Sequence, residues 1–126
     1  MQSKRSSLVS CMITGAVLAL STMSHPAHAE PFATNKDVLD TCSSPKSSEQ
    51  YTLCLGYIQG LLQRDELLRW THPNLAYTCE LPKGVGLDQI RAVVVKHLKD
   101  RPEGWHWTGA GTALYAIKRA FCEPSK

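Results

Sequence analysis

The sequence lacks the short motifs that mark many redox, metal and cofactor sites. It has no Cys-x-x-Cys pair, no Cys-x-x-Cys-His run and neither a His-x-x-x-His nor a His-Glu-x-x-His spacing. These absences argue against a thioredoxin-like redox centre, covalent haem attachment and a zinc hydrolase. Gly84-Val85-Gly86 also lacks the third glycine and the preceding strand of a dinucleotide-binding loop. We therefore expect a non-enzymatic protein that holds no cofactor and no metal.

A cysteine–histidine nucleophile pair is the sharpest enzymatic alternative. It needs a free thiol, which is scarce where an even set of cysteines is exported to an oxidising compartment. His72 and His106 adjoin tryptophans in loop-like sequence, and His97 lies beside the apolar stripe of an expected helix. We favour surface or packing roles for these three histidines.

An excess of charge of one sign is also missing. The chain has 14 Lys and Arg against 11 Asp and Glu, and Lys4 and Arg5 supply two of the basic residues. Beyond the N-terminal segment the net charge is about +1, and no block of like charges occurs. This balance argues against a nucleic acid partner and against binding to a membrane surface.

The first 29 residues have the pattern of a secretory signal peptide. Lys4 and Arg5 give a positive start, residues 8–23 are mainly apolar, and Ala27-His28-Ala29 is a small-x-small cleavage site. The apolar stretch is too short and too diluted by polar residues to favour a membrane span. We expect cleavage after Ala29, export from the cytosol and one small domain over residues 30–126.

Four cysteines remain after that cleavage, in a chain of 97 residues. An even number in a short exported chain predicts two disulfides, which allow three pairings. We favour Cys42–Cys54, because a short turn brings the end of the first expected helix to the start of the second. Cys79–Cys122 would then tie an irregular connection to the end of the last helix. Each bond typically adds about 2–4 kcal/mol of stability.

Apolar residues recur at helical spacing in four segments, so we expect an all-α domain of about four helices. A short first helix begins near residues 34–40, with Thr34 or Asn35 as its cap. Longer helices are expected over about 49–70, 87–100 and 109–121, the last capped by Thr108. Residues 72–86 contain two prolines and two glycines and read as an irregular connection.

Gly56 and Gly60 lie four residues apart in the second expected helix. Glycine there costs up to about 1 kcal/mol per residue relative to alanine, so a close approach of another backbone is the expected compensation. We favour helix packing within the domain over an intermolecular contact.

Residues 99–107 combine charged side chains and two tryptophans in a loop between helices. Tryptophan and arginine dominate the energetics of many interfaces, so this loop is a candidate partner-binding surface. We expect one of its tryptophans to be buried and the other to be partly available. The candidate contacts are Arg101, Glu103, Trp105, His106 and Trp107, with Arg64 and Arg69 of the second helix as secondary choices.

Several motifs together resemble the Rap/Tai-type immunity proteins over about residues 32–122. The run Cys54-Leu55-Gly56-Tyr57-Ile58-Gln59-Gly60 is the most specific of them. The others are Cys79 with Pro82 and Gly84-Val85 after it, Arg101-Pro102-Glu103, and a cysteine directly after a terminal Ala-Phe helix. The sequence departs from that pattern in the aromatic and glycine content of residues 105–111 and in having no proline before its last cysteine.

The resemblance implies a periplasmic, helical, disulfide-bonded inhibitor that tends to act as a dimer. Its partner would be a cognate peptidoglycan amidase effector delivered by type VI secretion, whose catalytic cleft it would cover. A small helical periplasmic stress protein, or acid-activated chaperone, is the alternative. Three histidines and 11 acidic residues permit that alternative, which predicts loosening or dissociation at low pH and binding to many unfolded clients.

Overall fold

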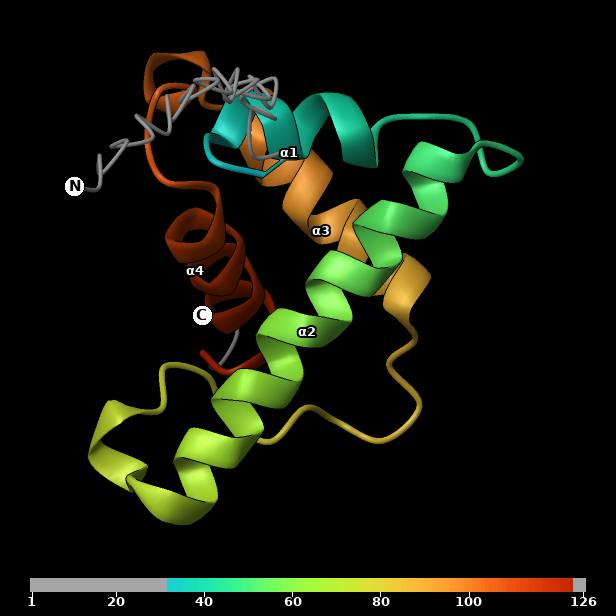
Figure 1. Ribbon diagram of the computed structural model, residues 1–126. Helices are drawn as coiled ribbons and strands as arrows, with labels where there is room; N and C mark the ends of the chain where they lie inside the picture. Colours follow the sequence, from blue (N-terminus) through green and yellow to red (C-terminus); the bar gives the residue numbers. More distant parts are fainter. Residues whose placement is uncertain (1–31, 124–126) are drawn as a thin grey trace, which may run out of the picture.

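Figure 1 shows the computed structural model of the chain, which describes residues 32–123. Within that range the protein is helical and has no strand, only one isolated β-bridge between Thr34 and Thr108. The predicted all-α fold is confirmed, whereas the predicted signal peptide lies outside the described residues. The helices are α1 (Asn35–Cys42), α2 (Glu49–Thr71), α3 (Leu87–Lys99) and α4 (Gly109–Phe121), with the 3-10 turns η1 (Pro73–Leu75) and η2 (Pro102–Gly104).

The start of α1 is fixed by a reciprocal pair of hydrogen bonds. The Thr34 hydroxyl accepts from the backbone N–H of Asp37, and the Asp37 carboxylate accepts from the backbone N–H of Thr34 at 2.9 Å. This arrangement satisfies donors that a helix start leaves unpaired. Of the two expected caps Thr34 is therefore the one in use, and Asn35 is buried as the first residue of the helix.

Among the other helices only α2 has a side-chain cap, and glycine or proline residues lie near the remaining boundaries. The Ser48 side chain accepts from the N–H of Tyr51 at the start of α2, and α2 ends two residues before Pro73. A turn at Gly84, whose φ of 88° suits glycine, precedes α3. At α4 the expected side-chain cap is wrong: Thr108 occupies the capping position, but its side chain makes no capping hydrogen bond.

Each pair of helices among α1–α4 is in contact, and the core lies between them. The core residues without any exposed surface come from all four helices, as expected of an apolar stripe on each. Four of the seven pack as branched aliphatic side chains on different helices: Val38, Ile58, Val94 and Ile117. The remaining three are Ala113 of α4 and the two cysteines that join α1 to α2.

Both predicted disulfides are confirmed. Cys42 and Cys54 join the end of α1 to the start of α2 with their Cα atoms 5.1 Å apart. Cys79 and Cys122 join the connection after η1 to the end of α4 across 43 residues of sequence. The first bond therefore closes a local turn, and the second holds the long irregular segment against the helical core.

Gly56 and Gly60 do not have the role expected of them. A Cβ atom at either position would have nothing within 4 Å apart from its own helix, and both residues are exposed. The expectation that they admit another helix of the same domain is wrong, because the packed face of α2 is the opposite one. That face carries Tyr51, Cys54, Ile58 and Asp65.

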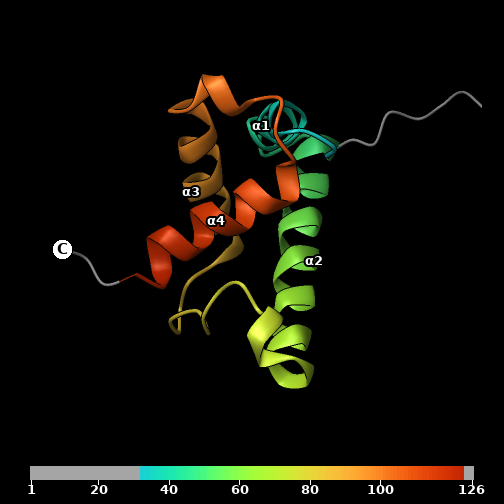
Figure 2. The same ribbon diagram turned by 90° about the vertical axis from the view of Figure 1, so that its left-hand side faces the viewer.

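The helix α2 runs past the core, so that the molecule has two distinct ends (Figures 1 and 2). The last turns of α2, η1 and the irregular connection form one end. The N-terminus of α1 and the loop around η2 form the other end. Across residues 32–123, none of the helices combines the length and apolar character required to cross a membrane.

Candidate partner-binding surface

Residues 100–108, here called the aromatic loop, connect α3 to α4 through η2. Three successive turns stiffen the loop from within, because the backbone N–H groups of Gly104, Trp105 and Trp107 donate to carbonyls three residues earlier. A fourth bond holds the centre: the indole N–H of Trp105 donates to the carbonyl of Leu98 at 2.9 Å. The loop is therefore a preformed structure with its own hydrogen-bond pattern.

The start of α1 anchors the aromatic loop from outside. The backbone N–H groups of Asn35 and Lys36 donate to the carbonyls of Trp107 and Trp105 at 2.8 and 3.0 Å. The carboxamide of Asn35 donates to the Gly104 carbonyl at 2.7 Å, across 69 residues of sequence. Two of these bonds use free backbone donors of the helix N-terminus and the third uses a side chain, so the loop is fixed by the same helix that contributes to the core.

The two tryptophans of the loop have different environments. Trp105 is partly buried against the core, with the ammonium of Lys36 5.5 Å from its ring centre. Trp107 is 53% exposed, and its ring lies over Gly104, where a Cβ would come within 3.0 Å of it. Trp107 is therefore the tryptophan available to a partner, and Trp105 supports the loop from below.

The polar members of the predicted surface point to solvent. Arg101, Glu103 and His106 are exposed, and His106 lies edge-on to Trp107 with ring centres 6.0 Å apart. Behind them, partial burial lowers the pKa of His97, and the positive charges of Arg101 and Arg119 lower it further. The negative charge of Asp100 acts in the opposite direction but does not cancel these effects on the pKa of His97.

The structure does not bring the secondary candidates, Arg64 and Arg69, to this surface. Both lie on the part of α2 that forms the opposite end of the molecule (Figure 1). Arg64 is exposed. Arg69 is turned inward, where its guanidinium donates to the Cys79 carbonyl at 3.0 Å and pairs with Asp65.

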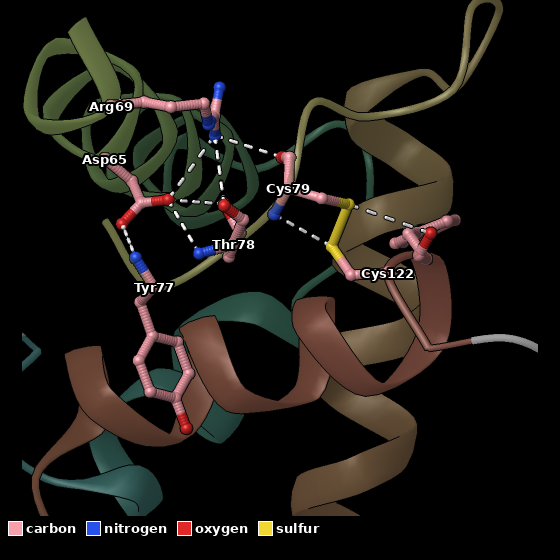
Figure 3. A network of polar contacts seen from close by, with 7 residues as sticks. Asp65, Arg69, Tyr77, Thr78, Cys79 and Cys122 are labelled. Carbon is pink, nitrogen blue, oxygen red and sulfur yellow. Dashed lines mark hydrogen bonds and ion pairs between the residues drawn. A yellow bond between two sulfur atoms is a disulfide. The ribbon is translucent and has the colours of Figure 1, made fainter. Parts of the chain in front are cut away.

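Asp65 is the centre of a polar network that the sequence analysis missed (Figure 3). Its fully buried carboxylate accepts from the backbone N–H groups of Tyr77 and Thr78 at 2.7 and 2.9 Å, and also from the Thr78 hydroxyl. Burial by itself raises the pKa of Asp65, but these hydrogen bonds and the charge of Arg69 outweigh it and lower the pKa below its ordinary value. The network fastens the connection after η1 to α2.

A second exposed surface was also missed. Leu67 and Trp70 on α2 are 62% and 82% exposed, although both are large and apolar. They continue a stripe with alternating spacings of three and four residues, here called the outer face of α2: Leu53, Gly56, Gly60, Gln63, Leu67 and Trp70. Between Gln50 and Gln63 the helix contains no charged residue.

Neither a free cysteine nor a metal-binding cluster is found in residues 32–123. All four cysteines of the described range are in disulfides. Residues 32–123 also contain no group of three His, Cys, Asp or Glu side chains placed to hold a metal ion. What the geometry provides is a rigid exposed loop at one end and an uncharged helix face along one side.

Comparison with known protein families gives one match. The sequence model of the Rap1a immunity proteins matches residues 34–122, from the cap of α1 to the second cysteine of the longer disulfide. The matched range contains all four helices, both disulfides and the whole aromatic loop. No curated protein and no solved structure matches the chain.

Proposed function

The chain belongs to the family of Rap1a immunity proteins, and from this we propose that it is a periplasmic immunity protein that blocks a peptidoglycan amidase effector of type VI secretion. The observation that supports the proposal best is the family match over the complete helical domain. The amidase, the periplasm and the blocking mode go beyond that match. They follow from the resemblance of the sequence motifs and from the rigid exposed loop.

The proposed mechanism is steric. A protein that inhibits by covering a cleft needs a projecting surface that keeps its shape, because ordering a flexible loop on binding costs affinity. The aromatic loop meets this need, since three bonds to the start of α1 and one to α3 hold it before any partner arrives. No residue of the loop is required to react with the effector.

We assign the contact with the effector to Arg101, Glu103, His106 and Trp107. Trp107 is the exposed aromatic anchor, and the charged side chains around it would set partner choice. Trp105 positions the loop rather than contacting the partner, because its indole N–H is bonded to Leu98 within the protein. Arg69 is engaged within the protein, so only Arg64 is kept as a secondary candidate.

Export agrees with the covalent structure. Disulfides persist in oxidising compartments such as the bacterial periplasm, and the described domain contains two. The N-terminal 29 residues have the charge and apolar pattern of a leader. A peptidoglycan amidase acts in that same compartment, so the proposed partner and the protein would meet there.

The outer face of α2 is the surface we assign to dimer formation. Antiparallel packing of two copies in one register places Leu67 opposite Gly56, Trp70 opposite Leu53 and Gln63 opposite Gly60, so the stripe pairs with itself. The glycines leave hollows because nothing lies near them, and the large side chains of the second copy would fill these hollows. The absence of charge from Gln50 to Gln63 fits the charge-poor centre of an interface.

The decisive experiment is titration of a periplasmic cell-wall amidase effector with the purified protein, followed by calorimetry and by assay of peptidoglycan cleavage. We expect saturable inhibition, and a loss of roughly 2 kcal/mol of binding free energy in Trp107→Ala, which is about 30-fold in Kd. Tyr77→Ala removes an exposed aromatic ring at the other end of the molecule and serves as the control. An unchanged affinity in a folded Trp107→Ala variant would remove the aromatic loop from the mechanism.

A further inference from the structure

A pocket of about 300 Å³ opens beside the aromatic loop, between the end of α3 and the start of α4. The buried residues Asn35 and Leu98 form its floor, and the rings of His97, Trp107 and Tyr115 contribute to its walls. His97 and Tyr115 are themselves arranged edge to face, with ring centres 5.6 Å apart. The pocket is thus a hollow with three rings in its lining, and it lies in the proposed contact surface.

The size of the pocket suits one aromatic ring system. A closed apolar cavity of about 150 Å³ is sufficient to hold benzene, so about 300 Å³ accommodates a phenol or an indole. Gly111 keeps one side open, because a Cβ there would meet no atom within 4 Å. A larger residue at this position would extend into free space rather than into the core.

Asn35, one of the residues that line the pocket, carries an unsatisfied polar atom. Asn35 is only 2% exposed, and its carboxamide nitrogen donates to the Gly104 carbonyl at 2.7 Å. That bond fixes the orientation of the side chain and leaves the carboxamide oxygen buried with no hydrogen-bond partner. The oxygen has almost no solvent-accessible surface, so a ligand donor reaches it only when the side chains that cover it shift; the donor then satisfies an acceptor that is costly to leave unpaired.

The charge around the pocket selects against a cation. Arg101 is the one Lys, Arg, Asp or Glu among the residues that line the pocket, whereas Asp100, which opposes the effect of Arg101 on the pKa of His97, does not line it. A lysine or arginine side chain would therefore be repelled. A neutral ring with a single hydrogen-bond donor can pack against the rings of the lining, donate to the Asn35 oxygen and avoid repulsion by Arg101.

We propose that this pocket receives the side chain of a tyrosine or tryptophan of the effector, with its O–H or N–H donated to the free oxygen of Asn35. The occupant assignment rests on the proposed function; the ring-binding property does not. Tyrosine and tryptophan are the residues that most often anchor an interface by filling a pocket, and Trp107 and Tyr115 provide ring faces and edges for packing. The aromatic loop would then both project toward the effector and enclose one of its side chains.

The test uses small molecules that are analogues of the side chains: p-cresol for tyrosine, 3-methylindole for tryptophan and toluene for phenylalanine. Each is titrated into ¹⁵N-labelled protein in the absence of any effector, with NMR signals of Trp107, Gly111 and Thr112 as the readout. We expect saturable shifts with p-cresol and 3-methylindole, and about fivefold weaker binding of toluene because it has no donor. Toluene binding as tight as p-cresol would overturn the role of Asn35, and the absence of shifts with all three would overturn the pocket.

Gly111→Leu is the variant designed to block the pocket, since a leucine side chain at this site would occupy the pocket from α4. We expect it to weaken p-cresol binding at least tenfold while the thermal midpoint does not fall. Ala120→Leu adds the same side chain at an exposed position of the same helix and should change nothing. Full p-cresol binding by Gly111→Leu would refute the site.

The effector titration separates the two proposals. If the protein binds p-cresol but inhibits no amidase, the proposed function fails and the ring pocket stands. If an amidase is bound and Gly111→Leu binds it as well as the unchanged chain does, the assignment of the occupant is wrong.

Discussion

Replacing Asp65 by asparagine tests how the irregular connection is held to the helical core. The substitution keeps the size and shape of the side chain but removes its charge and turns one acceptor into an NH₂ group. The oxygen that faces Tyr77 can still accept its backbone N–H. On the other side the NH₂ group would face the N–H of Thr78, which the carboxylate now accepts at 2.9 Å, and Arg69 would lose its ionic partner.

The expected loss follows from those contacts. A hydrogen bond to a charged group contributes about 1.5–3 kcal/mol, and breaking a buried charge pair by removing one member costs about 3–5 kcal/mol. Because Arg69 is 30% exposed and keeps its bond to the Cys79 carbonyl, we place the loss at the low end, at roughly 3 kcal/mol. In a domain of this size that corresponds to a fall in Tm of roughly 12–24 °C.

The assay is urea unfolding at pH 7 under non-reducing conditions, so that both disulfides stay closed. Asp88→Asn is the control, because Asp88 is half exposed and its 2.7 Å ion pair with Lys46 lies at the surface, where such pairs contribute little. A loss below about 1 kcal/mol for Asp65→Asn would refute the network as the support of the connection.

The pH dependence of stability provides an independent check that Asp65 stabilises the fold in its ionised form. Since the pKa of Asp65 is lowered in the folded protein, the stabilisation is complete above its unfolded value of roughly 4 and is lost as the pH falls below it. The stability difference between the two proteins should therefore shrink on acidification. A difference that stays constant from pH 7 down to pH 2 would contradict the assigned ionisation.

Three further predictions concern backbone contact, covalent links and self-association. Gly109→Ala should cost roughly 1–3 kcal/mol, because its Cβ would meet a core methyl group at 2.5 Å and a carbonyl at 2.9 Å. Gly111→Ala, in open space on the same helix, should be neutral or stabilising by up to about 1 kcal/mol. In thermal melts Gly109→Ala should therefore unfold at a lower temperature than Gly111→Ala. Replacing both cysteines of the Cys79–Cys122 bond by alanine should lower the free energy of unfolding by roughly 4 kcal/mol, and the same change at the Cys42–Cys54 bond by roughly 3 kcal/mol, because the closed loops span 43 and 12 residues. Equal losses in urea unfolding would contradict the loop-entropy account. Trp70→Lys should make the protein monomeric in sedimentation equilibrium, and a dimer that survives this change does not use the outer face of α2.

The helices were predictable because their signals are local. Apolar spacing within α2, α3 and α4 and a breaker residue at each end decide these elements without reference to the rest of the chain. The pairing of Cys42 with Cys54 is nearly local as well, since only a short turn separates the two helices that carry them. The second pairing then followed by elimination.

The use of each face of α2 was not predictable in the same way. The helix carries apolar residues on two sides, and the sequence does not say which side the other helices cover. Gly56 and Gly60 were assigned to the packed side, but the structure places them on the open side. Asp65 carried a usable signal, because it follows Cys54, Ile58 and Leu61 at helical spacing and so places an acid in the buried stripe. Its partners Tyr77 and Thr78 are reached only by the path of the connection, which local patterns leave open.

The exposure of Trp107 and the support by Trp105 depend on one long-range contact. The sequence indicated that two tryptophans would divide these roles but not which would take each. The division is decided by Asn35, whose backbone and side chain bind both Trp107 and Gly104 from α1. Because the carbonyl of Trp107 is held there, its ring is placed over Gly104 and left open to solvent. The start of α1 is therefore as much a part of the proposed recognition surface as the loop itself, although no side chain of α1 was a candidate contact.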